Sequence, residues 1–264
     1  MRELIHVVSS LKAKGEAFVE AKSWADSIGA VYEERRKRTT AQLRRDYGDN
    51  FLVYTTQGPK LFRPDGMHIF SLNMAELRIQ HIRQGQRDHL IEAIGATEPV
   101  SVLDCTCGFG ADSTVLSFAL PLGSTVTALE ASPLMAAVTG WGFRQFVHEK
   151  DDVTAALRRI TLHQTKYQDV LRSLPDQAYD VIYFDPMFDR PITASCQFQP
   201  VRDILDDESL GNDEIFLALQ KAKQKVIIKG RYFKRLQAEF PHLTIYGGKY
   251  SRVHFAVLEV NPHG

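Results

Sequence analysis

The sequence predicts an α/β fold: a doubly wound, seven-stranded, mostly parallel sheet with a small N-terminal α/β extension. From residue 100 onward, short apolar runs alternate with helical patterns, which is typical of βαβ units. A turn with two glycines joins the first apolar run to a helix. The last two runs have no helix between them, which predicts a terminal antiparallel hairpin.

The elements follow from hydrophobic periodicity along the chain. The predicted strands of the large sheet are 100–103, 125–129, 160–163, 179–184, 225–228, 244–246 and 253–260. The predicted helices are 112–119, 133–146, 167–174, 213–223 and 232–240, preceded by a helical region over 74–94 that breaks at Gly85. We expect two domains, residues 1–72 and 73–264.

The N-terminal extension mixes helical and strand patterns. Apolar residues at helical spacing predict a helix over 15–28, which Gly29 ends, and Thr39 or Thr40 caps a second helix through Arg45. The predicted strands are 5–8, 51–54, 60–62 and 68–70. The charge run 33–38, two acids followed by four bases, is either a solvated helix entry or a patch that contacts phosphate.

Composition limits the possible partners. The formal net charge is +0, so any contact with nucleic acid needs a local basic patch. An odd number of cysteines, 3, does not make a disulfide framework, and the Cys105/Cys107 pair lacks the second pair of a zinc site. We expect no metal, no membrane span and no signal peptide, and therefore a cytoplasmic protein of unknown oligomeric state.

The turn after the first large-sheet strand is the first candidate site. It runs from Asp104 through Thr106, Gly108 and Gly110 to a helix that opens with Ala111 and Asp112. Glycines let a backbone approach a ligand, and a helix N-terminus presents free N–H groups. An acidic strand end suits a cationic ligand without phosphate, such as S-adenosylmethionine (SAM), better than a pyrophosphate. The alternative is an ordinary tight βα loop.

Two further positions belong to the predicted cofactor site. Glu130 ends the second strand, where a carboxylate accepts hydrogen bonds from both hydroxyls of a ribose. The alternative is a surface glutamate before a helix that Ser132 caps and Pro133 begins. After the third strand, Thr165 or one of its neighbours either contacts an adenine base or caps the next helix.

The stretch Asp185–Phe188 follows a strand too apolar to be anything but buried. A carboxylate at that strand end, beside a proline that fixes the loop, faces the place where a group would be transferred. It resembles the D-P-P-Y loop of amino methyltransferases, in which the acid binds an exocyclic NH2 and the aromatic ring stacks on the base. Asp185, Pro186 and Phe188 are therefore the candidate catalytic residues. The alternative is a plain strand end with Phe188 in the core.

Basic residues fall in loops near the same predicted edge of the sheet: Arg190, Arg202, Lys229, Arg231, Lys249 and Arg252. They either neutralise phosphates around a target nucleotide or are solvated loop charges.

Several motifs together resemble the small-subunit ribosomal RNA guanine-N2 methyltransferase J family. They are the stretches 74–78, 104–112, 129–133, 183–188 and 226–229, within a similarity over 58–260. The likeness to uncharacterised Gram-positive methyltransferase-like proteins is closer still and includes the run 34–38. Two departures are Ala111, where the family has Arg, and 189–192, where it has a lysine-rich loop.

The resemblance implies a class I, Rossmann-like methyltransferase fold, SAM as cofactor and ribosomal RNA or the small ribosomal subunit as partner. It implies cofactor contacts at Ala111, Asp112, Glu130, Ala131, Thr165, Lys166 and Asp185. The expected activity is methyl transfer to an exocyclic amino group of guanine. The alternatives are a same-fold methyltransferase acting on a protein or small molecule, and a non-catalytic RNA- or nucleotide-binding protein with a vestigial pocket.

Overall fold

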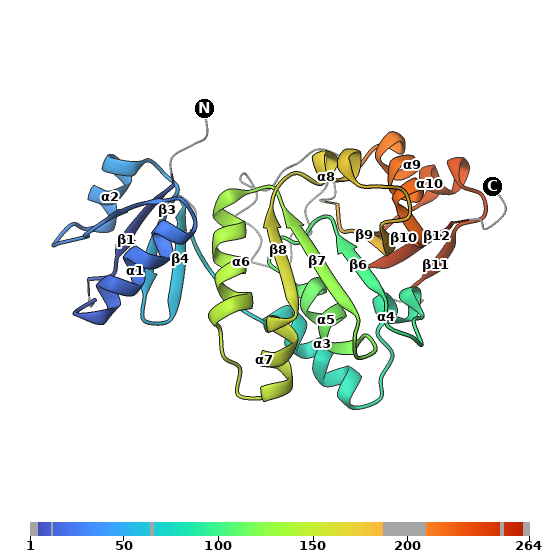
Figure 1. Cartoon of the computed structure of the whole chain (residues 1–264), viewed down its shortest axis with the longest axis horizontal. Helices are drawn as coiled ribbons and strands as arrows, with labels where there is room; N and C mark the ends of the chain where they lie inside the picture. Colours follow the sequence, from blue (N-terminus) through green and yellow to red (C-terminus); the bar gives the residue numbers. More distant parts are fainter. Residues whose placement is uncertain (1–4, 12, 64–65, 187–209, 249–250, 261–264) are drawn as a thin grey trace. The chain divides into compact units, whose positions relative to one another are not determined.

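The computed structural model describes residues 5–11, 13–63, 66–186, 210–248 and 251–260 (Figure 1). Contacts between Cα atoms divide these residues into two compact units. The first, here the small-sheet unit, holds the described residues up to Ser71 together with Ser132–Phe146. The second, here the large-sheet unit, holds the other described residues. The boundary expected after residue 72 stays a prediction.

The small-sheet unit is built on a five-stranded sheet of order β2-β1-β3-β4-β5. Its first two pairings, β1 with β2 and β1 with β3, are parallel, and β3, β4 and β5 form an antiparallel meander. The strands are β1 (His6–Ser9), β2 (Val31–Glu33), β3 (Phe51–Thr55), β4 (Gly58–Arg63) and β5 (Gly66–Ile69). The sequence did not predict β2, because a three-residue edge strand leaves almost no periodic pattern.

Two predicted helices accompany this sheet, α1 (Glu16–Ser27) and α2 (Thr40–Tyr47). In α1 the buried residues Ala21, Trp24 and Ala25 share one face at helical spacing. Thr39 begins α2 with a capping box, in which its side chain and that of Gln42 each bind the other's backbone N–H. Of the two predicted caps, Thr39 and Thr40, the structure therefore shows Thr39.

Two members of the charge run 33–38, Arg35 and Arg38, are bonded to protein partners, while Glu34, Arg36 and Lys37 are exposed. Arg35 is only 8% exposed, and its Nε donates to the Arg38 carbonyl at 3.0 Å. Arg38 in turn donates to the Tyr47 hydroxyl at 2.6 Å and to Asp46 Oδ2 at 3.1 Å. These bonds hold the turn that precedes α2 against the helix. The expectation of a solvated helix entry is wrong for Arg35, and Arg38 is already occupied by protein partners.

Helix α6 (Pro133–Gln145) packs in the small-sheet unit, although its sequence follows a strand of the other sheet. Ser132 caps it by accepting a bond from Met135 N–H, and Pro133 occupies the first helical position, as predicted. The Trp141 ring lies against Gly58, where an added Cβ would sit 2.4 Å from the ring. Phe70 packs edge-on against Phe143, with ring centroids 6.0 Å apart.

The large-sheet unit confirms the predicted fold class. Its seven strands have the order β11-β12-β10-β9-β6-β7-β8. All neighbours from β10 to β8 are parallel, and β12 runs antiparallel to both β10 and β11. The strands are β6 (Ser101–Asp104), β7 (Thr125–Glu130), β8 (Ile160–Gln164), β9 (Tyr179–Phe184), β10 (Ala222–Gly230), β11 (Thr244–Tyr246) and β12 (His254–Glu259).

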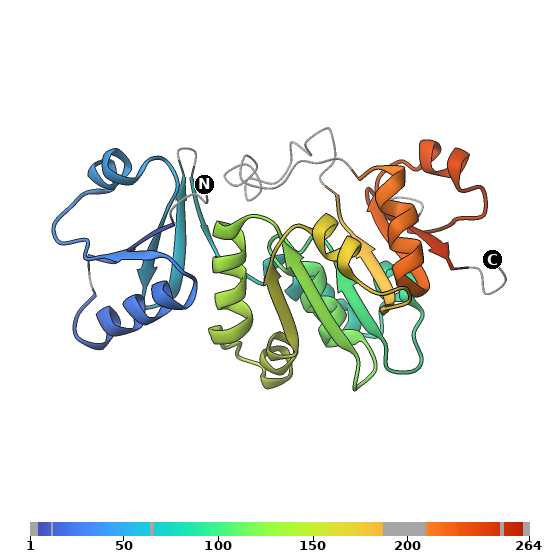
Figure 2. The same cartoon turned by 45° about the horizontal axis from the view of Figure 1, so that its top comes forward.

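Helices cover both faces of this sheet (Figures 1 and 2). One face carries α8 (Tyr167–Ser173), α9 (Asn212–Lys221) and α10 (Lys234–Glu239). The other carries α3 (Asn73–Arg83), α4 (His89–Ile94), α5 (Ala111–Ala119) and α7 (Asp151–Arg158). The predicted break at Gly85 separates α3 from α4, with Gly85 at φ +74°. Helix α7 was not predicted. No helix in the described ranges is long and apolar enough to cross a membrane.

The central strands are buried on both faces, and their carboxyl ends meet at one edge of the sheet. Val102, Leu103 and the whole run from Val181 to Phe184 are essentially inaccessible to solvent. In the parallel register Asp104 lies opposite Ala128 on one side and Tyr183 on the other. This alignment places the acidic ends of β6 and β7 and the residue after β9 at the same edge, where doubly wound folds bind ligands.

We predict that Gly58→Ala destabilises the small-sheet unit by about 2–5 kcal/mol. Alanine at φ +98° costs about 1–2 kcal/mol, and its Cβ would overlap the Trp141 ring. Urea unfolding followed by tryptophan fluorescence measures this, since both tryptophans, Trp24 and Trp141, belong to that unit. The matched control is Gly48→Ala, at φ +83° with nothing within 4 Å. Equal losses in both variants would contradict the packing of α6 on β4.

Candidate active site

The turn after β6 has the backbone that its glycines predict. Gly108 and Gly110 adopt φ +51° and +78°, and Gly110 is the N-cap of α5. Backbone bonds tie the turn to both neighbouring strands. Cys105 N–H donates to the Tyr183 carbonyl and Cys107 N–H to the Leu129 carbonyl, each at 2.9 Å. The turn is therefore held between β9 and β7.

Asp104 organises this turn from inside. Its side chain is buried, Oδ1 accepts from Thr106 N–H at 3.0 Å, and Oδ2 accepts from the Ser113 hydroxyl. Burial raises the pKa of Asp104 to about 7, even though both hydrogen bonds favour the ionised form. Asp104 thus links the end of β6 to the turn and to the first turn of α5.

Glu130 is buried as well, at 5% exposure, so the alternative of a surface glutamate is wrong. Its Oε2 accepts from Gly108 N–H at 2.8 Å, which joins the acidic end of β7 to the glycine turn. Each carboxylate oxygen has two lone pairs, so this bond is compatible with further donors. Its carbonyl accepts from Thr165 N–H at 3.0 Å.

The loop after β8 lies next to Glu130 through backbone bonds. Helix α8 begins after Lys166, which is its N-cap and makes no side-chain capping bond. The N-cap is therefore Lys166, a neighbour of Thr165, and not Thr165 itself. The Ala131 carbonyl accepts from the Gln164 side chain at 3.0 Å. Contacts of Ala131, Thr165 and Lys166 with a cofactor stay predictions.

Asp112, in the first turn of α5, is the centre of a buried charge cluster. Its carboxylate accepts from the Arg78 guanidinium, from the Tyr183 hydroxyl at 2.8 Å and from Lys229 Nζ at 2.9 Å. Burial alone would raise the pKa of Asp112, but the charges of Lys229 and Arg78 hold it well below its usual value. Arg78 also binds Asp88 through two parallel bonds of 2.7 and 2.9 Å.

Asp185 belongs to the same cluster. Its Oδ2 accepts from Lys229 Nζ at 2.7 Å, and its backbone N–H donates to Thr106 Oγ1 at 2.6 Å. Burial raises the pKa of Asp185, and the Lys229 charge opposes that rise. The side chain keeps 30% exposure, so it is anchored and still reachable. Pro186 follows it and ends the described segment, and the predicted stacking residue Phe188 lies outside the described residues.

Sequence reasoning missed three members of this cluster: Arg78, Tyr183 and Lys229. Lys229 was expected either to contact phosphate or to be solvated, and the solvated alternative is wrong, since Lys229 bridges two carboxylates at 21% exposure. A usable signal existed for Tyr183, because a phenol inside a buried apolar strand needs a hydrogen-bond partner. For Arg78 there was none, since it meets Asp112 from a separate helix.

The cysteine pair is not a metal site within the described residues. Cys105 and Cys107 are buried free thiols whose pKa values burial raises well above the usual range. No group of three or more metal-ligating side chains is found in the part of the chain that the structure describes.

The edge of the sheet fits a cationic nucleoside such as SAM. A Cβ added to Gly108 would meet nothing closer than the Thr106 carbonyl at 4.0 Å, so open space lies over the turn. Acidic side chains surround it, at Asp104, Asp112, Glu130 and Asp185. Their oxygens are acceptors that suit an ammonium, a sulfonium and a ribose diol, while Lys229 and Arg78 offset the charges of Asp112 and Asp185.

The large-sheet unit has the class I SAM-dependent methyltransferase architecture. Its seven-stranded doubly wound sheet ends in an antiparallel hairpin, a glycine turn follows its first strand, and an acid ends its second strand. The family model described as "Putative SAM-dependent methyltransferase" matches residues 64–255, and the chain belongs to this family. The protein is therefore a SAM-dependent methyltransferase, and the alternative of a non-catalytic binding protein is not retained.

Individual relatives agree with this family. The chain is 27% identical to the uncharacterized protein YpiP of Bacillus subtilis, over 97% of this chain and 100% of that one. It is 29% identical to the ribosomal RNA small subunit methyltransferase J of Aeromonas salmonicida, over 75% and 85%. A solved SAM-dependent methyltransferase of Neisseria gonorrhoeae shares the fold, with a TM-score of 0.66 at 19% identity over 98% and 97%.

We predict that Lys229→Met shifts the acidic limb of the methyl-transfer pH profile to higher pH. Without the ammonium, the pKa of Asp185 rises further, so the carboxylate ionises only at higher pH. Activity near pH 7 should fall about tenfold or more and recover as the pH is raised.

The matched control is Lys225→Met, which removes a lysine from the same strand. Lys225 is paired with Glu259 at 3.3 Å, away from the cluster, and its loss should leave the profile unchanged. A Lys229→Met enzyme with a wild-type pH profile would contradict the role assigned to the ammonium.

Proposed function

We propose that this methyltransferase acts on an exocyclic amino group of guanine in ribosomal RNA. The observation that carries the proposal is Asp185, a partly exposed carboxylate held by Lys229 and Thr106 at the end of β9. An acceptor of this kind suits an NH2 group. Similarity to the ribosomal RNA small subunit methyltransferase J of Aeromonas salmonicida supports RNA as the substrate.

In this proposal the ends of β6 and β7 hold the cofactor. Glu130 accepts hydrogen bonds from the ribose hydroxyls, while Asp104 and Asp112 set the position of the methionine end. Gly108 and Gly110 keep the turn free of side chains that would fill the space. The other proposed cofactor contacts are Thr106, Ala111, Ala131, Thr165, Lys166 and Asp185.

Asp185 positions the target nitrogen. Its carboxylate accepts a bond from the guanine NH2, and Pro186 restricts the loop that follows. Phe188 is proposed to stack on the base, which would hold it out of its helix or loop. Orientation of the nitrogen lone pair then supplies most of the rate, because the two reacting atoms are held in line.

Bound SAM supplies an electrophilic methyl group on a sulfonium sulfur. Transfer of that methyl group from sulfur would leave positive charge on the target nitrogen, which the Asp185 carboxylate would stabilise. The extra proton then leaves the nitrogen for Asp185 or water. A strong base is not required, since the amine becomes acidic only after transfer.

The test is methylation of rRNA purified from cells that lack its guanine-N2 modifications, as naked RNA and as small ribosomal subunits. We expect N2-methylguanosine in the digested product by mass spectrometry. Asp185→Ala should lower the rate about a hundredfold or more, consistent with the loss of positioning, and still bind S-adenosylhomocysteine.

Fully modified rRNA is the substrate control. Methylation of a protein or a small molecule, with no N2-methylguanosine from either form of the RNA, would contradict the proposal and favour the same-fold alternative. An rRNA substrate would place the activity in the cytoplasm.

A further inference from the structure

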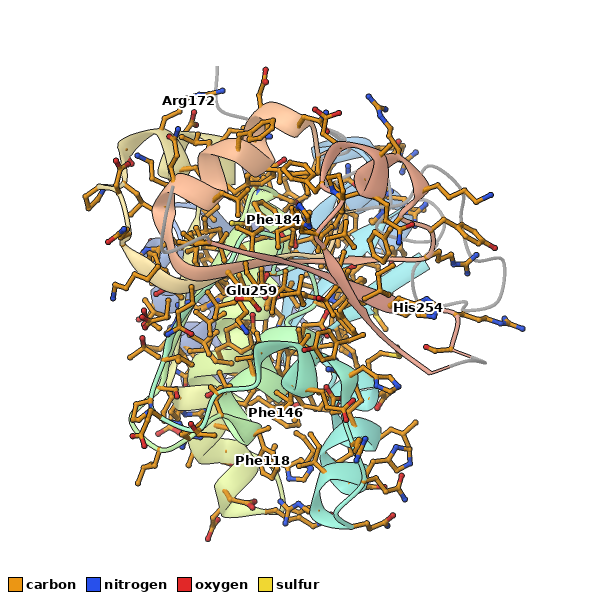
Figure 3. The ribbon with its side chains drawn as sticks, turned by 90° about the vertical axis from the view of Figure 1, so that its right-hand side faces the viewer. Phe118, Phe146, Arg172, Phe184, His254 and Glu259 are labelled. Atoms are coloured by element: carbon orange, nitrogen blue, oxygen red, sulfur yellow. The ribbon has the colours of Figure 1, made fainter. Side chains whose placement is uncertain are left out.

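A cavity lies at the carboxyl end of β10, on the sheet edge that carries Asp185. Its volume is about 260 Å³, and it is lined by Arg231, Tyr232, Ser251, Arg252 and His254. Gly230, the last residue of β10, pairs with His254, the first of β12. Figure 3 shows His254 and Glu259 at opposite ends of β12, which fixes the end at which the cavity opens.

The chain turns sharply after β10 and exposes Tyr232. A Cβ on Gly230 would lie 2.5 Å from the Phe233 ring, so only glycine lets that ring fold back over the strand into the core. Phe233 is 8% exposed, and its neighbour Tyr232 is 87% exposed. An aromatic ring this accessible contributes nothing to the core and is available to a ligand.

The cavity carries positive charge without a counter-charge. Among the described residues, neither Arg231 nor Arg252 has a carboxylate within ion-pair distance. The Arg231 Nε–H is buried, and no acceptor within hydrogen-bond distance is found for it in the described part of the chain. A buried donor left unsatisfied costs free energy, which an anionic ligand would recover.

The opposite wall is fixed by the segment before β12. Ser251 Oγ donates to the Val253 carbonyl and accepts from Val253 N–H, so its hydroxyl is used within the turn. Gly247, at φ +153°, leaves room for the His254 ring, since a Cβ there would lie 2.3 Å from it. The groups left for a ligand are therefore two guanidiniums, one phenol ring and one imidazole.

We propose that this cavity binds one nucleotide of the RNA that flanks the methylated base, a subsite that rests on the proposed function. Arg231 and Arg252 bind its phosphate, and Tyr232 stacks on its base. Guanidiniums match phosphate oxygens, and an exposed ring stacks on any base irrespective of sequence. The cavity is smaller than the ~300–1,000 Å³ of pockets that enclose a whole ligand, which suits a single nucleotide of a longer chain.

The test combines binding of fluorescent oligouridylate, measured by anisotropy, with the KM for undermethylated rRNA. We expect Tyr232→Ala to lower the affinity for oligouridylate and raise the KM for rRNA, each by roughly tenfold. The double variant Arg231→Met with Arg252→Met should cause the same two changes and should also reduce the salt dependence of binding. The kcat at saturating RNA and the affinity for S-adenosylhomocysteine should remain those of the wild type.

Two variants are matched controls. Tyr232→Phe keeps the ring and should bind RNA like the wild type. Arg172→Met removes an exposed arginine that is bonded to Asp169 at 3.3 Å. Figure 3 shows Arg172 well away from His254, so this variant should change neither the binding of oligouridylate nor the KM.

The outcomes separate this subsite from the proposed function. If the wild type binds oligouridylate through Tyr232 but does not methylate rRNA, the subsite stands and the proposed function fails. If rRNA is methylated and the Tyr232→Ala and double arginine variants keep wild-type KM and binding, the subsite is overturned. Failure of the folded wild type to bind any RNA overturns both.

Discussion

The active site depends on one electrostatic arrangement, the pairing of Asp112 and Asp185 through the Lys229 ammonium. Two carboxylates this close to each other repel strongly in a poorly hydrated environment, and each isolated charge would be costly to bury. Lys229 Nζ lies 2.9 Å from one and 2.7 Å from the other, and Arg78 neutralises Asp112 from the opposite side. The Lys229 charge thereby opposes the rise in the pKa of Asp185 that burial causes at the end of β9.

The same cluster joins parts of the chain that are distant in sequence. Arg78 comes from α3, Asp112 from α5, Tyr183 from β9 and Lys229 from β10. Thr106 adds a link from the glycine turn to the backbone of Asp185. These bonds therefore connect the glycine turn, the start of α5 and the end of β9 directly.

The sequence was sufficient for features that depend on local pattern. The strand, glycine turn and helix from Ser101 to Ala119, and the acid ending β7, follow from short-range periodicity and turn chemistry. Their mutual placement then follows from parallel pairing, because the carboxyl ends of parallel strands share an edge.

What the sequence could not supply was pairing between side chains from separate elements. The partner of Arg78 lies 34 residues away, and that of Lys229 at Asp112 lies 117 away. The bonds of Arg35 and Arg38 in the charge run 33–38 were missed for the same reason, since composition alone does not distinguish a solvated charge from a paired one. Helix α7 was an avoidable miss, because Val153, Ala156 and Leu157 follow helical spacing.

The central claim is that the glycine turn and the acid ending β7 form one cofactor pocket. Calorimetric titration with S-adenosylhomocysteine tests it most directly, on the wild type, Glu130→Ala and Glu130→Gln. Glutamine retains an acceptor for Gly108 N–H but offers one oxygen where a diol needs two.

The account predicts saturable one-to-one binding by the wild type. It predicts an affinity at least about tenfold weaker in both variants, as expected when a charged hydrogen bond is lost. Wild-type affinity in both variants, or no binding by a well-folded wild type, would contradict it.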